Sequence, residues 1–279
     1  MNLDEKMDKF ARYIDRSENI VFLGGAGVST ESGIPDFRSA SGIYNINKNR
    51  VDKTEEEYDV PPEVMLSRTY FFAHTDKFYD FYKSKMLYLD AKPNDAHKVL
   101  AKLEKKGKLK AVVTQNIDNL HQEAGSKNVI ELHGTVKNNF CIKCRKKFDV
   151  DYIVRSTGIP YCDNYNCGGI IKPDVVLYEE QLNQNSVKSA INYITNADML
   201  IIGGTSLAVY PAASFVNYFY FESKHNRNNK TDKRDKAKKF SVIINKSETA
   251  FDDMFDISIK EDGIGSIMRK LYVMLYGDL

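Results

Sequence analysis

The sequence of 279 residues has no tryptophan, only four cysteines and no apolar run long enough to cross a membrane. Its charges nearly balance, with 40 Lys plus Arg against 38 Asp plus Glu and a net charge of +2. No global excess of positive charge therefore points to nucleic acid or to an anionic membrane. Residues 1–16 are charged and amphipathic and lack the apolar core of a secretory signal, so we expect a cytoplasmic protein.

One local exception to this charge balance is a basic, polar run over residues 222–239. The run lacks the interleaved aromatic side chains on which nucleic acid bases would stack. We therefore expect a solvated loop and no specific nucleic acid partner. Contact with nucleic acid or with an acidic partner is the alternative.

The four cysteines lie within 27 positions and form two pairs, Cys141-x2-Cys144 and Cys162-x4-Cys167, separated by 17 residues. Two pairs of thiolates at such short spacings suit a tetrahedral zinc ion. Disulfides in a secreted protein are the alternative, which the N-terminal residues argue against. Four cysteine ligands leave no open coordination position, so we expect one structural zinc ion rather than a catalytic one.

Short and almost wholly apolar runs alternate with amphipathic helical patterns, which is typical of strands buried on both faces of a parallel sheet. The predicted strands are 19–23, 109–114, 129–132, 199–202 and 241–244, and the clearest helical patterns are 3–15 and 96–106. We therefore predict an α/β fold with a doubly wound, Rossmann-like parallel sheet.

Two segments interrupt this alternation and predict a smaller inserted lobe. Residues 41–90 carry apolar and aromatic clusters typical of a helical module, and residues 138–171 contain the cysteines of a zinc ribbon. We predict a single catalytic domain over 1–279, with a cleft between its two lobes. The large lobe would comprise 1–40, 91–137 and 172–279, and the small lobe 41–90 and 138–171.

A glycine-rich turn, Gly24-Gly25-Ala26-Gly27, follows the first predicted strand. In doubly wound folds such a turn cradles a pyrophosphate on backbone N–H groups. The dehydrogenase pattern G-x-G-x-x-G is not met, because Thr30 replaces the third glycine and no carboxylate ends a strand about twenty residues later. The turn predicts an unusual nucleotide or dinucleotide site, with a tight structural turn as the alternative.

The continuation, residues 31–38, is a loop that presents an acid, an aromatic ring and an arginine. Arg38 can reach a phosphate and Phe37 can screen a reactive ring from water, which suggests a cofactor lid. A surface loop with a structural pair of Asp36 and Arg38 is the alternative.

Polar side chains also follow two other predicted strands. Gln115, Asn116 and Asp118 come directly after 109–114, at the strand end where doubly wound sheets bind ligands, although Asp118 could instead cap a helix. His133 follows 129–132 and is the best placed of the five histidines for a general base, although a lone histidine is more often structural.

Taken together, these motifs resemble those of the sirtuins, the NAD-dependent protein-lysine deacylases. The matching segments occur in the family's order and span most of the chain: 25–38, 114–121, 132–134, the four cysteines, 204–212 and 244–245. The resemblance implies that His133 is the general base and that Asn116 and Asp118 orient the nicotinamide ribose and hold the carboxamide.

The resemblance also implies the residues that bind the two substrates and the metal. Those expected around NAD are Gly25, Ala26, Gly27, Thr30, Asp36, Phe37, Arg38, Gln115, Asn116, Ile117, Asp118, Gly204, Thr205, Ser206, Asn245, Lys246, Asp262 and Gly263. Those expected around the acyl-lysine peptide are Val175, Val176, Leu177, Tyr178 and Val209, with 175–178 as a strand that pairs with the peptide backbone. Zinc would be held by Cys141, Cys144, Cys162 and Cys167.

The activity that the resemblance implies is NAD-dependent protein-lysine deacetylation on acetyl-lysine proteins or peptides, by a monomer. NAD would be consumed, and the products would be deacetylated lysine, nicotinamide and O-acetyl-ADP-ribose. Protein mono-ADP-ribosyl transfer and removal of longer acyl chains are alternatives on the same scaffold. A non-enzymatic NAD sensor is a further alternative, but it would have no use for His133 together with Asn116 and Asp118.

Two positions depart from the family's usual sequence. Glu179 replaces a glycine beside the expected peptide strand, which adds a charge there and could favour basic flanking residues. Relatives that remove succinyl groups carry a Tyr-x-x-Arg pair, whose nearest match here is Tyr82-Lys83-Ser84-Lys85. A bidentate clamp on a carboxylate is therefore not evident, and we expect deacetylation.

Overall fold

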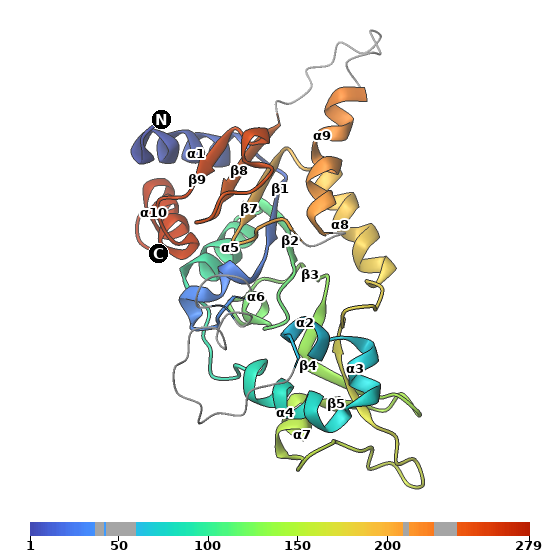
Figure 1. The fold of residues 1–279 in the computed structure, drawn as a ribbon. Coiled ribbons are helices and arrows are strands. Elements are labelled where there is room, and N and C mark those ends of the chain that lie inside the picture. The colour runs from blue at the N-terminus through green and yellow to red at the C-terminus, as the bar shows by residue number, and fades with distance from the viewer. Residues whose placement is uncertain (37–41, 43–59, 209–211, 226–238) are drawn as a thin grey trace.

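The computed structural model describes residues 1–36, 42, 60–208, 212–225 and 239–279. A six-stranded parallel sheet in the order β3-β2-β1-β7-β8-β9 forms its centre (Figure 1). Its strands are β1 Ile20–Gly24, β2 Leu109–Thr114, β3 Val129–Glu131, β7 Met199–Gly203, β8 Phe240–Ile244 and β9 Ile257–Ile259. The predicted doubly wound fold is confirmed, and β9 is a strand that the apolar pattern did not reveal.

Helices cover both faces of this sheet, as Figure 1 shows. The helices α1 Leu3–Arg16, α5 Asp95–Lys105 and α10 Ile264–Tyr276 share one buried apolar cluster with the sheet, and α8 Gln184–Asn196 and α9 Phe215–His225 share another. Every residue of β1, β7 and β8 is buried, because both faces of these strands are covered. The sheet is therefore a rigid platform for the loops that follow its strands.

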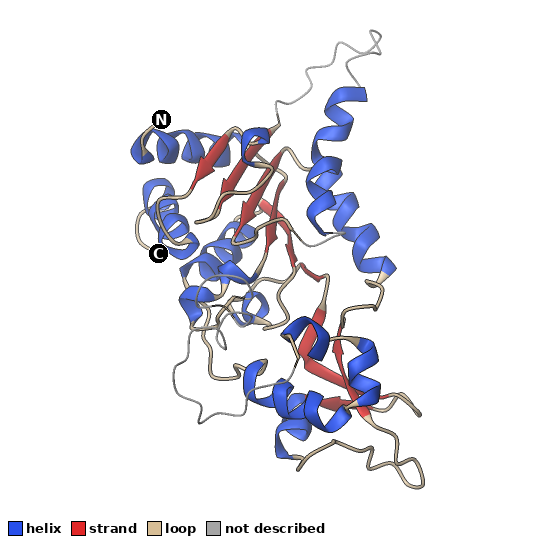
Figure 2. Cartoon of the chain, in the orientation of Figure 1, coloured by secondary structure: helices blue, strands red, loops and turns tan. Residues whose placement is uncertain are grey.

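A second, smaller region lies beyond the carboxyl ends of these strands, at the bottom of Figures 1 and 2. It holds an antiparallel sheet in the order β5-β4-β6, with β4 Gly134–Cys141, β5 Lys147–Asp149 and β6 Ile171–Val175. Its helices are α2 Pro62–Met65, α3 Arg68–Ala73, α4 Thr75–Lys85 and α7 Val150–Arg155. Aromatic side chains of α3 and α4, including Phe71, Phe78 and Tyr79, pack with Val136 and Ile171 of the sheet in a third apolar cluster.

The antiparallel sheet begins at Gly134 and ends at Val175, a few residues outside the predicted zinc-binding module 138–171. The division of the chain into two lobes stays a prediction. In the part of the chain that the structure describes, no helix is long and apolar enough to span a membrane.

Short elements complete the described chain. They are α6 Leu120–Glu123 and the 3-10 helices η1 Ala26–Val28, η2 Thr30–Ser32, η3 Ala212–Ser214 and η4 Asp252–Met254. The elements η1, η2 and α6 directly follow β1 and β2, so they lie at the carboxyl edge of the parallel sheet. The sheet order reverses between β1 and β7, and such a switch point is where doubly wound folds bind ligands.

Candidate active site

The loops after β1 and β7 pack against each other at this switch point. The N–H of Gly25 donates to the carbonyl of Gly203 over 3.1 Å, and that of Gly27 donates to the carbonyl of Gly204 over 2.8 Å. A Cβ on Gly27 would lie only 2.7 Å from the Cα of Gly204, so the contact needs glycine. These two N–H groups therefore stabilise the loop, and the predicted contact of the turn with a nucleotide stays a prediction.

Thr30 stands where the dehydrogenase pattern has its third glycine. Its hydroxyl donates to the carbonyl of Gly27 over 3.0 Å and starts the 3-10 turn η2. The threonine therefore closes the turn locally, and the chain here forms two short 3-10 turns instead of the long helix of a dehydrogenase.

Ser29 joins the two polar residues that follow β2. Its hydroxyl lies 2.6 Å from Oδ2 of Asp118 and accepts a hydrogen bond from Nδ2 of Asn116 over 3.0 Å. The other oxygen of Asp118 accepts the N–H of Leu120, the first residue of α6, over 2.9 Å, so this carboxylate is held at the start of α6 and also lines the site. Burial raises the pKa of Asp118, while the bond from Ser29 lowers it.

Ser29 was not among the predicted site residues. It is buried, and it links the loop after β1 to the loop after β2. Its place inside the glycine-rich motif was the available signal, but a serine at the start of a turn is commonly only structural.

His133 lies in the turn between β3 and β4, not at the end of a strand, because β3 ends at Glu131. Its Nδ1 is 2.8 Å from the carbonyl oxygen of Gln115. A carbonyl can only accept, so Nδ1 carries the proton and Nε2 is left as the basic nitrogen. Burial lowers the pKa of His133, which keeps the ring neutral near pH 7, while the bond to Gln115 opposes that shift.

Gly134 fixes the direction in which His133 projects. It has a φ of 77°, and a Cβ at this position would collide with the carbonyl of Asp174 on β6. The N–H of Val176 also donates to the carbonyl of His133 over 2.9 Å. The backbone on the carboxyl side of the histidine is therefore held by the end of β6 and by Val176, the residue after it.

Four of the residues described above, Ser29, Asn116, Asp118 and His133, share the wall of one cavity of about 610 Å³. Apolar side chains, among them Leu66, Ile117 and Val136, form one part of this wall, and the glycine loops and polar side chains form another. A volume of this size suits a small organic ligand.

The cavity separates the predicted NAD residues into three groups. Twelve line it: Gly25, Ala26, Gly27, Asp36, Gln115, Asn116, Ile117, Asp118, Gly204, Thr205, Ser206 and Asn245. Four do not: Thr30, Lys246, Asp262 and Gly263. Two, Phe37 and Arg38, lie outside the described residues, as does the predicted peptide contact Val209.

Three predicted NAD residues near the carboxyl end of the chain lie outside the cavity wall: Lys246, Asp262 and Gly263. Asp262 accepts the N–H of Gly263 over 2.6 Å at the start of α10, and Gly263 packs closely against Glu31. Lys246 is exposed on the loop after β8. Asp262 and Gly263 therefore lie at the start of α10 and outside the wall of this cavity, and their contact with NAD stays a prediction.

The predicted peptide strand is only partly a strand. Val175 ends β6, whereas residues 176–178 continue as an extended loop, and all four predicted residues line the cavity. The N–H of Tyr178 donates to the carbonyl of Leu66, and the carbonyl of Tyr178 accepts from Arg68, each over 3.0 Å. This pairing forms an isolated parallel bridge between Tyr178 and Ser67, so only Val175 of this segment belongs to a regular strand, and its pairing with a peptide backbone stays a prediction.

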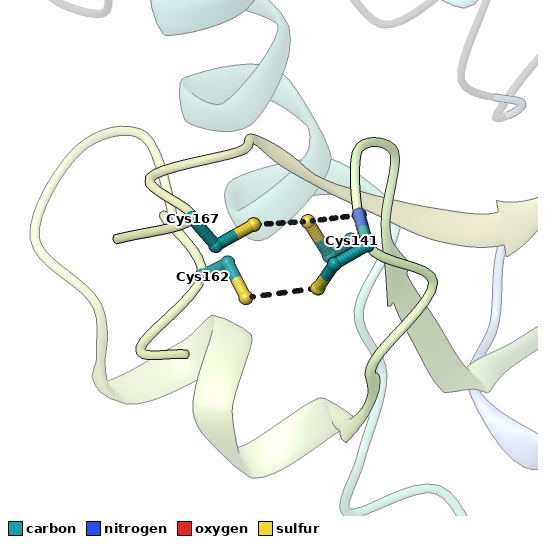
Figure 3. Close-up of side chains that lie close together, drawn as sticks. Cys141, Cys162 and Cys167 are labelled. Atoms are coloured by element: carbon teal, nitrogen blue, oxygen red, sulfur yellow. Dashed lines mark hydrogen bonds between the residues drawn. The ribbon is translucent and has the colours of Figure 1, made fainter. Parts of the chain in front are cut away.

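The four cysteines come together at the tip of the antiparallel sheet. Their sulfur atoms all lie within 4.8 Å of one another, and Figure 3 shows those of Cys141, Cys162 and Cys167 turned inward. The Cys141–Cys167 and Cys144–Cys162 sulfur distances are both 3.6 Å. Zinc–sulfur bonds of about 2.3 Å in a tetrahedron place sulfur atoms about 3.8 Å apart, so the residues fit zinc. All four thiols are free, and a disulfide would need about 2 Å.

The comparisons with known proteins agree with this geometry. A model of the Sir2 family matches residues 25–211. An NAD-dependent protein deacetylase of Clostridium tetani is 54% identical over 91% of this chain and 92% of its own length. One of Clostridium acetobutylicum is 50% identical over 96% of this chain and 99% of its own length.

Solved structures show the same likeness. A Sir2 complex with a p53 peptide and NAD+ is 37% identical with a TM-score of 0.78, covering 96% of this chain and 98% of its own. A Sir2 variant with a deacetylated p53 peptide and 3'-O-acetyl ADP ribose is 36% identical with a TM-score of 0.80, covering 98% and 99%. The chain therefore belongs to the Sir2 family, and the resemblance to the sirtuins is confirmed.

Proposed function

We infer that this protein is an NAD-dependent protein-lysine deacetylase. The observation that supports this function most directly is that His133 lies on the wall of the same cavity as Asn116 and Asp118, with its Nδ1 proton donated to Gln115. Membership of the Sir2 family, the deacetylase names of its relatives and the NAD and peptide in the related structures support this function.

The residues around the cavity suit the chemistry of this reaction. When bound, NAD supplies the ribose to which the acetyl group is transferred, and nicotinamide, O-acetyl-ADP-ribose and deacetylated lysine are the products. Nε2 of His133 accepts the proton of a ribose hydroxyl, because burial keeps the ring neutral and ready to act as a base. Ser29 holds Asn116 and Asp118 in fixed orientations toward the cavity.

Water must be kept from the activated sugar until the acyl oxygen attacks it, since water would compete with the acyl group there. The apolar side chains Leu66, Val136 and Met86 on the cavity wall serve this purpose. One water molecule is consumed afterwards, when the acetyl group leaves the lysine nitrogen. We propose that the twelve cavity-lining residues predicted for NAD contact it, and that 175–178 contact the peptide. The two-lobed domain and a cytoplasmic location complete the proposal, the latter supported by four free thiols, which persist in a reducing compartment.

The decisive experiment incubates the protein with an acetyl-lysine peptide and NAD and follows the products by mass spectrometry. We expect His133→Ala to lower kcat by about 10²–10⁴-fold with an unchanged thermal melting curve. His74→Ala is the matched control, because His74 is exposed and does not line the cavity. Undiminished deacetylation in His133→Ala would overturn the assignment. Label from NAD on protein instead of on O-acetyl-ADP-ribose would favour mono-ADP-ribosyl transfer.

A further inference from the structure

Glu179 adopts a backbone conformation that ordinarily selects glycine. Its φ is 74°, in the left-handed region, where a side chain is disfavoured. The sirtuin pattern has glycine at this position, so the glutamate here needs a compensating interaction. It directly follows Tyr178, at the end of the segment proposed to contact the peptide.

The compensation is a pair of hydrogen bonds to Thr69 in the first turn of α3. Oε2 of Glu179 accepts the backbone N–H of Thr69 over 2.9 Å and its hydroxyl over 2.7 Å. These two bonds continue the backbone pairing of Tyr178 with Leu66 and Arg68. The bonds from Thr69, and then the nearby Arg68, lower the pKa of Glu179, so the acceptor is a carboxylate near pH 7.

Glu179 also stands at the border of two hollows. It lines the main cavity and a second, more open hollow of about 560 Å³. Val175, Val176 and Glu180 line both as well. A peptide whose acyl-lysine enters the main cavity and whose flank lies in the second hollow must pass over this border.

Glu180, the next residue, also stabilises this border by hydrogen bonds. Its carboxylate accepts the amine of buried Lys172 over 3.0 Å and the N–H of Leu177 over 2.9 Å. Glu179 therefore links this turn to α3, and Glu180 links it to β6.

We propose that Glu179 is a positioning residue whose hydrogen bonds to Thr69, the Glu179–Thr69 latch, hold the peptide-binding border in its binding conformation. This inference rests on the proposed deacetylase function. The latch takes over the role of the family's glycine by a different route, since side-chain bonds secure a turn that glycine permits through backbone freedom. Preorganising the border lowers the free energy needed to order it on peptide binding.

Recognition of a basic flanking residue by Glu179 is the competing role. The carboxylate oxygen that faces α3 already has two donors, and Arg68 is close by. A substrate cation that approached Oε1 would share the carboxylate with the two bonds from Thr69 and with the nearby Arg68. The contacts therefore favour the latch, and charge selection becomes an outcome of the test.

The test measures KM for peptide and for NAD in Glu179→Ala, Thr69→Val and the double variant. We expect Glu179→Ala, which removes both bonds, to raise the peptide KM about tenfold, and Thr69→Val, which removes only the hydroxyl bond, to raise it less, with less than about twofold change in kcat and in the NAD KM. The double variant should be no worse than Glu179→Ala alone, because both the backbone bond and the hydroxyl bond from Thr69 end on the carboxylate that this variant removes. Glu179→Gln keeps an acceptor oxygen and should recover most of the peptide affinity.

Thr75→Val is the matched control in the same helical module. Its hydroxyl donates to the carbonyl of Phe71 over 2.7 Å and does not touch the border, so we expect a lower Tm and an unchanged peptide KM. Additive effects of the two latch variants, or parallel changes in both KM values and Tm, would overturn the proposal. So would a loss in Glu179→Ala that is confined to peptides with Lys or Arg flanks and absent in Thr69→Val.

One readout separates this proposal from the proposed function. The amide of Thr69 should exchange with deuterium faster in Glu179→Ala than in the wild type, without any substrate. Failure of the wild type to act on acetyl peptides, with this exchange difference present, would refute the deacetylase function and leave the latch standing. Equal exchange rates would refute the latch itself.

Discussion

The parallel sheet and the cysteine tip of the antiparallel sheet achieve rigidity in opposite ways. Strands β1, β7 and β8 are wholly buried between helices, and the loops that carry Gln115 and Asn116 start from that packed platform. At the tip, Tyr165 is 89% exposed and Cys144 is exposed as well, while Cys141 and Cys162 are buried at the edge of the third apolar cluster. The site chemistry therefore depends on burial, whereas the tip depends on a metal ion that bridges four thiolates.

Removing one zinc ligand should produce the largest difference in stability between the two regions. We expect Cys162→Ser to lose zinc, to unfold the antiparallel region and to abolish deacetylation, because three thiolates hold the ion weakly and zinc binding supplies the folding free energy of such a tip. Zinc content, activity and hydrogen exchange over 134–175 are the measurements.

Tyr165→Ala is the control for this change, since it alters an exposed side chain in the same turn. Exchange over the parallel strands should stay slow in both variants. A zinc-free Cys162→Ser protein with full activity would contradict the dependence of the peptide site on the tip.

The junction of the two regions can be tested at Gly134. We expect Gly134→Ala to reduce the free energy of unfolding by about 3 kcal/mol, since it adds left-handed strain and a collision with Asp174. Gly107→Ala is the matched control: its φ is 76°, but a Cβ there meets no atom within 4 Å, so about 1 kcal/mol is expected. Urea unfolding measures both, and equal losses would mean that the contact between β4 and β6 adds nothing.

Acid should act on the parallel-sheet region through buried histidines. His97 and His121 lie behind the site with ring centroids 4.7 Å apart, and burial lowers the pKa of His97 to about 4. The unfolded chain takes up this proton near pH 6.5 and the folded chain only near pH 4, so stability falls as pH drops through that window.

For His97 alone, the loss between pH 7.5 and pH 5 should be about 2 kcal/mol. Urea midpoints of the wild type and His97→Gln at the two pH values measure it, because release of zinc by acid affects both proteins equally. An identical pH dependence in the two proteins would show that folding does not lower the pKa of His97.

Much of the site could be predicted from the chain because its parts are local. The run of Gln115, Asn116 and Asp118 follows a strand, and any parallel sheet brings such strand ends to one edge. The parts of the site that could not be predicted from the sequence also have a physical explanation. The bond from Nδ1 of His133 to Gln115 joins residues 18 positions apart, and the bond from Ser29 to Asp118 spans 89 positions, so no local pattern contains either.

The amino-acid sequence by itself determined the alternation of buried strands and helices, the glycines at the switch point and the set of four thiols, because burial, backbone freedom and metal preference belong to residue types and short spacings. Only the tertiary structure decided that Ser29 bridges two loops, that β6 stops at Val175 and that Glu179 turns toward Thr69. Each of these depends on a partner brought close by packing, and hydrogen bonds act only over about 3 Å.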